Sequence, residues 1–235
     1  MQLSKRLLTV AGFVTPGSRV ADVGTDHGYV PIYLVETGRS PGAIAMDINE
    51  GPLLRAQQHI REACLEDYIQ TRRSDGAAAL KIGEADTLIA AGMGGPLMEK
   101  ILTQGREVLE SCREFILQPQ SEIREFRKYL QRNGFRIEQE DMVQEDGKFY
   151  PILRAVHGRM EWEKEIEFRF GKLLLEQRHS VLLDFLQREQ KVNREITERL
   201  AGNKSRAGQN RLAQMKEERL EIEAALAYYE VQRNY

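Results

Sequence analysis

The sequence predicts an α/β fold in which a mostly parallel, doubly wound sheet of seven strands precedes a helical appendage. Up to about His157, apolar strand-like runs alternate with segments of helical periodicity, which is typical of a parallel sheet with helices on both faces. After Gly158, glycine and proline nearly vanish and helix-forming residues dominate. We therefore expect two domains, residues 1–158 and residues 159–235.

Seven segments are the candidate strands. In chain order they are residues 19–23, 42–47, 69–74, 87–91, 114–118, 134–143 and 149–156. Only a short polar turn separates the last two, so a helical crossover cannot join them. They predict an antiparallel hairpin at the edge of the sheet.

Two antiparallel helices are the predicted form of the appendage. Apolar residues recur there at helical spacing in two runs, the second close to heptad spacing: Trp162, Ile166, Phe170, Leu174, Val181, Phe185, Val192, Ile196 and Leu200, then Leu212, Met215, Ile222, Leu226 and Tyr229. Residues 201–208 between the runs include helix-stop and turn residues. The pattern predicts a coiled-coil hairpin.

Composition excludes several classes of protein. A net charge of −2 argues against a uniformly basic nucleic-acid binder, although it is compatible with a local basic patch. Cys64 and Cys112 have no CxxC partner and no histidines at metal-ligand spacing, which indicates a reducing compartment and no structural metal. The apolar run at residues 7–14 is too short to span a membrane and lacks a cleavage site. We expect a soluble, cytoplasmic protein.

The loop after the first predicted strand, DVGTDHG at residues 22–28, has the strongest functional signal. A strand ending in acid-x-Gly before a helix surrounds a nucleotide-sized crevice with backbone N–H groups and a carboxylate. The glycine triplet of a dinucleotide site is missing, and Asp22 would repel a pyrophosphate but accept a hydrogen bond from an ammonium group. S-adenosylmethionine has such a group. The alternative for Asp22 and Gly24 is a helix cap and a turn.

Two more acids follow the next two predicted strands. Asp47, followed by Ile48, ends the second strand, where a carboxylate can accept hydrogen bonds from ribose hydroxyls. Asp75 and Gly76 follow the third strand, in position to receive an adenine amino group, although an ordinary Asp-Gly turn is the alternative. Acids at three successive strand ends predict one nucleoside pocket.

A glycine-rich segment, AAGMGGP at residues 90–96, follows the fourth strand. It has no Asn, Asp or aromatic residue to hold an exocyclic amine. Its glycines allow a flat base to approach the backbone, which fits attack by a ring nitrogen. We assign Ala91 and Gly92 to the cofactor and Gly94 and Gly95 to the substrate; a tight strand-to-helix packing turn is the alternative.

Six blocks together resemble the bacterial tRNA (adenine-22-N1)-methyltransferases: DVGTDHGYVP (22–31), AIAMD (43–47), NEGP (49–52), AGMGG (91–95), LQP (117–119) and EDGK (145–148). The resemblance covers residues 4–158. It implies a Rossmann-like class I methyltransferase fold with a coiled-coil appendage, acting on N1 of an adenine in the D-arm of tRNA. It also makes Gln118 and Pro119 candidates for substrate binding. The chain departs from the family pattern at Asp47, Gln120 and Pro151, where Glu, Asn and an acid are more usual.

Methylation of N1 requires the adenine to leave its stack, which costs on the order of a few kcal/mol. Tyr29 is the candidate stacking platform that offsets this cost, with core packing as the alternative. Asp26 stands where related motifs have glycine, so its carboxylate can accept the N6 proton as positive charge develops; the alternative is a helix cap. The sequence fits two roles for His27 equally well, a contact with cofactor or substrate and a structural hydrogen bond.

A basic segment lies at the expected tip of the hairpin. Between residues 199 and 216 there are five basic residues and no acidic one, namely Arg199, Lys204, Arg206, Arg211 and Lys216. We expect Lys204, Arg206 and Arg211 to contact tRNA phosphates, although a solvated helix surface is the alternative. The resemblance suggests a similar role for Lys5 and Arg6. We expect a monomer.

Three other functions are compatible with parts of the sequence. The chain could methylate another RNA, a protein or a small molecule. It could also be a non-catalytic RNA-binding or scaffold protein that retains the cofactor fold, although the intact set of Asp22, Asp47 and Asp75 speaks against this. A nicotinamide dehydrogenase is the least favoured, because the third glycine and a hydride-site pair are missing.

Overall fold

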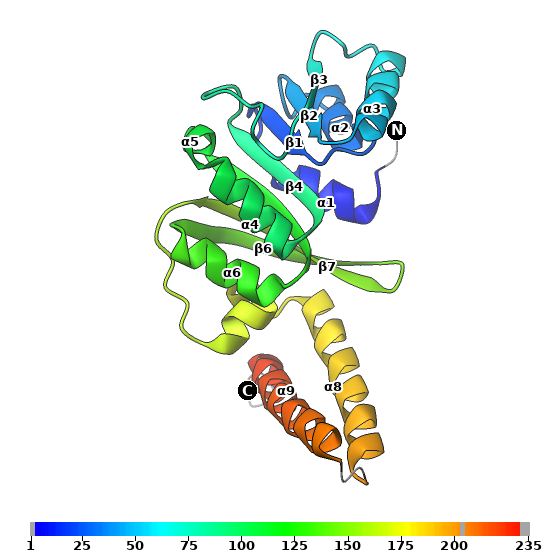
Figure 1. Cartoon of the computed structure of the whole chain (residues 1–235), viewed down its shortest axis with the longest axis vertical. Helices are drawn as coiled ribbons and strands as arrows, with labels where there is room; N and C mark the ends of the chain where they lie inside the picture. The colour runs from blue at the N-terminus through cyan, green and yellow to red at the C-terminus, as the bar shows by residue number, and fades with distance from the viewer. Residues whose placement is uncertain (1–2, 203–204, 231–235) are drawn as a thin grey trace. The chain divides into compact units, whose positions relative to one another are not determined.

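The computed structural model describes residues 3–202 and 205–230. The chain divides into two units, residues 1–161 and residues 162–235 (Figure 1). The division falls three residues after the composition change at Gly158. In the described residues, no helix is long and apolar enough to cross a membrane.

Seven strands of the first unit form one sheet in the order β3-β2-β1-β4-β5-β7-β6. Their bounds are β1 Val20–Val23, β2 Ala43–Asp47, β3 Ile69–Arg73, β4 Thr87–Gly94, β5 Glu114–Ser121, β6 Phe135–Glu145 and β7 Lys148–His157. Strands β1 to β5 pair in parallel, whereas β7 is antiparallel to both β5 and β6. The predicted strands and the edge hairpin are therefore confirmed.

Strands β4 and β5 each extend three residues beyond the predicted ends. Their pairing continues through two register shifts, between Ala91 and Met93 and between Met93 and Gly94. Such bulges let a strand bend while keeping its partner. The glycine-rich segment, expected to follow the fourth strand, is therefore mostly part of that strand, and helix α4 begins only at Gly95.

Among the described residues of the first unit, six helices flank the sheet: α1 Lys5–Phe13, α2 Tyr29–Glu36, α3 Glu50–Glu62, α4 Gly95–Gln104, α5 Arg106–Leu109 and α6 Ile123–Arg132. Helices α1, α2 and α3 contribute Val10, Ile32 and Ile60 to one buried cluster with β-strand residues. Helices α4 and α6 lie side by side on the face of the sheet turned toward the viewer in Figure 1. Strand β1 lies between β2 and β4, where the strand order reverses, and ligands bind beyond the carboxyl ends of strands at such a point.

The β6–β7 hairpin extends beyond its pairing with β5. The β5–β7 register includes Phe115–Leu117, whereas β6 and β7 stay paired out to Glu145 and Lys148. The outer part of the hairpin packs against α1, because Val143 and Ile152 belong to the same buried cluster as Val10. Glu145 is thereby brought to the carboxyl edge of the sheet.

The second unit contains a π-helical turn at Glu167–Gly171, α7 Lys172–Glu176, α8 Ser180–Leu200 and α9 Arg206–Glu230. Helices α8 and α9 pack together, and Asn193 Nδ2 donates a hydrogen bond to the Met215 carbonyl at 2.8 Å. The predicted helical hairpin is confirmed. The first of the two predicted runs is divided in the structure, because the chain breaks between α7 and α8.

The break is a helix C-terminus formed without glycine. Arg178 adopts the left-handed conformation, with φ of 51°. The amide of His179 donates to the Leu174 carbonyl and that of Arg178 to the Leu175 carbonyl, which is the hydrogen-bond pattern of a Schellman motif. Glycine usually occupies the left-handed position, so the sequence pattern contained no stop signal here.

The packed face of α8 also differs from the predicted one. The fully buried residues are Leu182, Leu186 and Asn193, each one position after the predicted Val181, Phe185 and Val192. The predicted turn at 201–208 is shorter than expected, because α9 begins at Arg206 and buries Gly208. Ser205 Oγ accepts a hydrogen bond from the Gly208 amide at 3.0 Å, which caps the new helix.

Candidate active site

A cavity of about 440 Å³ lies at the carboxyl ends of β1 and β4, at the point where the strand order reverses. Six of the predicted site residues line it, namely Asp22, Gly24, Asp26, His27, Tyr29 and Ala91. It is also lined by Arg6 of α1 and Glu145 of the β6–β7 hairpin. The structure therefore brings together the loop after β1 with two segments far away in the sequence.

Asp22 is 7% exposed, next to the end of β1. Burial raises the pKa of its carboxyl group to about 6; a hydrogen bond from Thr25 opposes the shift, and the charge of Asp47 adds to it. A buried carboxylate is costly unless a cation or several donors accompany it. This acid is therefore suited to a positively charged ligand.

The loop leaves β1 through Gly24, which has a φ of 75°. The amides of Gly24 and Thr25 both donate to the Met46 carbonyl, at 2.8 and 2.9 Å. A Cβ at Gly24 would lie 2.0 Å from Met93 Cε, so a side chain there would collide with Met93. The first residue of α2 follows Gly28, and that helix has no side-chain cap, which excludes the cap interpretation of Asp22 and Asp26.

Asp26 lies at the cavity with 63% of its side chain exposed, and it forms an ion pair with Arg55 of α3. His27 Nε2 lies 3.3 Å from the other carboxylate oxygen of Asp26. The sequence contained no signal for Arg55, since it belongs to none of the motif blocks. One oxygen of the predicted catalytic acid is thus held by an arginine.

Three aromatic rings stack beside Asp26. The ring centroids of His27, Tyr29 and His59 lie 4.9–5.5 Å apart and their planes are 13–24° from parallel. His59 Nδ1 lies 2.9 Å from the His27 carbonyl oxygen, which ties α3 to the loop. Tyr29 packs partly against the core and also lines the cavity, so core packing and a place at the candidate site are compatible for this residue.

The acids after β2 and β3 lie along the same edge, outside the cavity lining. Asp47 Oδ1 accepts a hydrogen bond from the Asn49 amide at 2.7 Å, and Ile48 is 50% exposed. Asp75 forms an ion pair with Lys100 of α4 at 3.1 Å. Gly76 has a φ of 59°, as the turn interpretation of Asp75-Gly76 requires.

Gln118 connects three segments of the edge. It is fully buried, and its Oε1 accepts hydrogen bonds from Arg6 Nη1 at 2.9 Å and from the Gly92 amide at 3.1 Å. The Arg6 guanidinium lies 5.5 Å from the centre of the Tyr150 ring, and the Arg6 amide lies 3.4 Å from Glu145 Oε1. Gln118 therefore holds Arg6 on the cavity wall.

Gly94 and Gly95 are explained by packing. A Cβ on Gly94 would lie 2.8 Å from Ser121 Oγ, and one on Gly95 would lie 2.9 Å from the Ser121 carbonyl oxygen. Pro119 is buried in β5. The absence of side chains at the two glycines therefore allows β4 and α4 to pack closely against β5, whatever else approaches them.

The basic residues of the hairpin tip are only partly described. Lys204 lies outside the described residues. Arg206 is exposed at the start of α9. Arg211 donates a hydrogen bond to Gln214 at 2.6 Å and lies 3.8 Å from a Glu218 oxygen, so acids just beyond the segment offset part of its charge.

In residues 3–202 and 205–230, no three His, Cys, Asp or Glu side chains group to hold a metal ion. This is the part of the chain that contains the cavity.

Comparisons with known proteins agree with this geometry. A family model described as "Methyltransferase domain" matches residues 3–153. The tRNA (adenine(22)-N(1))-methyltransferase of Bacillus subtilis is 39% identical over 158 residues, which cover 67% of this chain and 66% of that protein. The crystal structure of the Bacillus subtilis m1A22 tRNA methyltransferase TrmK matches with a TM-score of 0.85 and 30% identity, covering 96% of this chain and 99% of that one. Streptococcus pneumoniae Sp1610 in complex with S-adenosyl-L-methionine matches with a TM-score of 0.85 and 34% identity, covering 96% and 100%.

Proposed function

Because this chain belongs to the family of the bacterial tRNA (adenine(22)-N(1))-methyltransferases, we propose that it transfers a methyl group from S-adenosylmethionine to N1 of adenine 22 in the D-arm of tRNA. One observation carries the proposal. The cavity lined by Asp26 and the buried Asp22 lies at the switch point of the sheet, in a chain that matches a cofactor-bound relative over 96% of its length.

The residues of the cavity fit the cofactor. S-adenosylmethionine supplies an electrophilic methyl group on a sulfonium and a positively charged ammonium. Asp22 would hold the ammonium, since a cation offsets the cost of burying its carboxylate. Gly24 has no side chain, so the cofactor could approach its backbone closely beside Asp22.

The other cofactor contacts come from the neighbouring strand ends. Asp47 would accept hydrogen bonds from the ribose hydroxyls, and exposed Ile48 would lie against the adenine ring. Asp75, with Gly76, would receive the adenine amino group in exchange for part of its contact with Lys100. His27, Ala91 and Gly92 complete the proposed set.

The target adenine would stack on the platform of Tyr29 and the two histidine rings. Its N1 lone pair needs no deprotonation, so the protein has only to orient it and to stabilise the charge that moves onto the ring. One carboxylate oxygen of Asp26 would accept the N6 proton of the adenine as positive charge develops on the ring. The other oxygen would stay in its ion pair with Arg55. Gly94, Gly95, Gln118 and Pro119 would form the floor beneath the base.

Binding of the rest of the tRNA is a separate part of the proposal. Arg206 and Arg211, with Lys204, would contact phosphates of the tRNA. We further propose that the protein is cytoplasmic and acts as a monomer. Sedimentation with and without tRNA would test the monomeric state.

Mapping of the product tests the proposed function directly. Unmodified tRNA is incubated with the protein and S-adenosylmethionine, and N1-methyladenine is located by reverse transcription, which stops where the Watson–Crick edge is blocked. We expect a stop at position 22 and none in a tRNA that has guanosine there. Methylation at other positions would favour another RNA substrate, and binding of cofactor without any transfer to tRNA would favour the non-catalytic alternative.

A further inference from the structure

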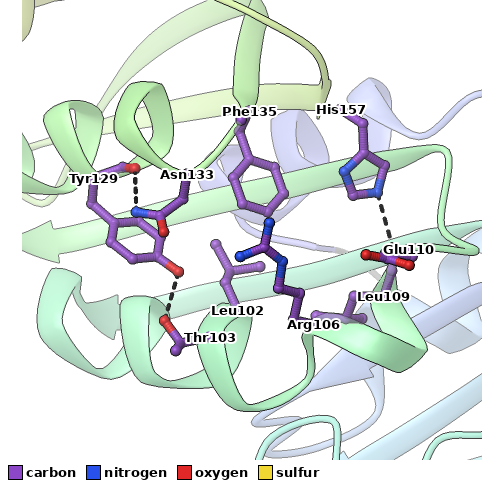
Figure 2. A pocket seen from close by; sticks show the side chains of 10 residues that line it. Leu102, Thr103, Arg106, Leu109, Glu110, Tyr129, Asn133, Phe135 and His157 are labelled. Atoms are coloured by element: carbon purple, nitrogen blue, oxygen red, sulfur yellow. Dashed lines mark hydrogen bonds between the residues drawn. The ribbon is translucent and has the colours of Figure 1, made fainter.

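A second cavity, of about 160 Å³, lies in the first unit at the opposite edge of the sheet from the candidate active site (Figure 2). It is bounded by α4, α5 and α6 and by the paired residues Phe135 and His157 of β6 and β7, beside the amino end of β5. Its floor is apolar, because Leu102, Leu109 and Phe135 are buried. None of the functions described above uses it.

Hydrogen bonds between α6 and α4 and between β7 and α5, and one at the end of α6, hold the walls in place without a ligand. The Tyr129 and Thr103 hydroxyls lie 2.8 Å apart and connect α6 to α4. Asn133 Nδ2 donates to the Tyr129 carbonyl at 2.9 Å, and His157 Nε2 lies 3.1 Å from the Leu109 carbonyl oxygen. Ligand sites are usually largely formed in advance in this way.

Arg106 supplies a positive charge to this cavity. Figure 2 shows its guanidinium beside the ring of Phe135. Within residues 3–202 and 205–230 its side chain makes no ion pair or hydrogen bond, not even with Glu110, which directly follows α5. Burial raises the pKa of Tyr129, and the hydrogen bond with Thr103 and, to a smaller extent, the charge of Arg106 oppose that shift.

The size and lining of the cavity limit its ligand. An engineered apolar cavity of about 150 Å³ accepts benzene, so a volume near 160 Å³ suits a single six-membered ring. The rings of Phe135 and His157 stack on each other with their centroids 5.5 Å apart, and together they form an aromatic part of the cavity lining. Arg106 offers a charged donor for an anion at the rim.

We propose that this cavity binds a pyrimidine nucleotide, with the base against Phe135 and the phosphate on Arg106. The proposal does not depend on the methyl transfer described above. The nucleotide comes either from the free pool or from an RNA strand, and both sources present the same ring and phosphate.

The test measures binding of uridine monophosphate by calorimetry to the full chain saturated with S-adenosylhomocysteine, which blocks the first cavity. We expect binding, and at least about tenfold weaker binding of uridine, which lacks the phosphate. Arg106→Gln should weaken uridine monophosphate binding by about tenfold or more. Arg113→Gln, at an 83% exposed arginine outside the cavity, should have no effect. Absence of binding to the wild type, or equal binding by Arg106→Gln, would overturn the proposal.

Methylation kinetics identify the source of the nucleotide. If Arg106→Gln raises the KM for tRNA and uridine monophosphate competes with tRNA, the ligand is part of the RNA. If tRNA kinetics do not change while uridine monophosphate binding is lost, the site takes a free nucleotide. Because wild-type methylation is measured in the same assay, failure of this proposal is distinguishable from failure of the proposed function.

Discussion

Replacement of Asp22 by asparagine should change stability and cofactor binding in opposite directions. Burial raises the pKa of Asp22 from 3.8 to about 6, so the unfolded chain releases this proton at lower pH than the folded protein does. Ionisation of Asp22 therefore destabilises the fold increasingly between about pH 4 and pH 6, and by a constant amount above pH 6.

The magnitude follows from the two pKa values. At about 1.4 kcal/mol per pKa unit, the difference between 3.8 and about 6 corresponds to about 3 kcal/mol at pH 7.5. Asp22→Asn keeps the size of the side chain and removes its charge. In the absence of cofactor, we expect it to raise the free energy of unfolding in urea by up to about 3 kcal/mol at pH 7.5, and by less than about 1 kcal/mol near pH 4. Asp67→Asn, at an exposed aspartate, is the matched control.

Cofactor affinity should fall in the same variant. S-adenosylhomocysteine has the same ammonium group, and we expect Asp22→Asn to weaken its binding at pH 7.5 by about tenfold or more. Wild-type affinity should also fall as the pH drops below about 6, whereas the affinity of the variant should not follow this change. A stability gain that is equal at pH 4 and pH 7.5, or unchanged affinity in calorimetry, would refute the reasoning.

Three further variants test the proposed site and the proposed tRNA contacts. Asp47→Ala should weaken S-adenosylhomocysteine binding by about 1–3 kcal/mol, and unchanged affinity in calorimetry would remove Asp47 from the site. Asp26→Asn should lower kcat by about 10²-fold or more with cofactor binding retained; near-normal single-turnover methylation would leave Asp26 without a catalytic role. Combined Arg206→Glu and Arg211→Glu changes should raise the KM for tRNA and flatten its salt dependence, without changing the KM for S-adenosylmethionine; an unchanged salt slope would favour a solvated surface.

Local patterns were sufficient to predict the sheet. Each strand is an apolar run bounded by turn residues, and the polar turn before β7 allowed only a hairpin. The helical appendage was less predictable. Arg178 follows the end of α7 in the left-handed conformation that glycine usually adopts. The buried face of α8 consists of Leu182, Leu186 and Asn193, because α9 packs on that side. Apolar periodicity cannot distinguish two adjacent faces when both contain apolar residues.

The sequence by itself determined which acids stand at strand ends, and therefore that Asp22 and Asp47 share one edge, since parallel strands present their carboxyl ends together. Only the tertiary structure decided what surrounds them. Arg55 reaches Asp26 from 29 residues away, and Arg6 reaches Gln118 from 112 and Glu145 from 139. Such contacts depend on strand order and on how α1 and α3 pack against the loop and the hairpin. No short pattern encodes that packing, because burial and electrostatic complementarity act through space and not along the chain.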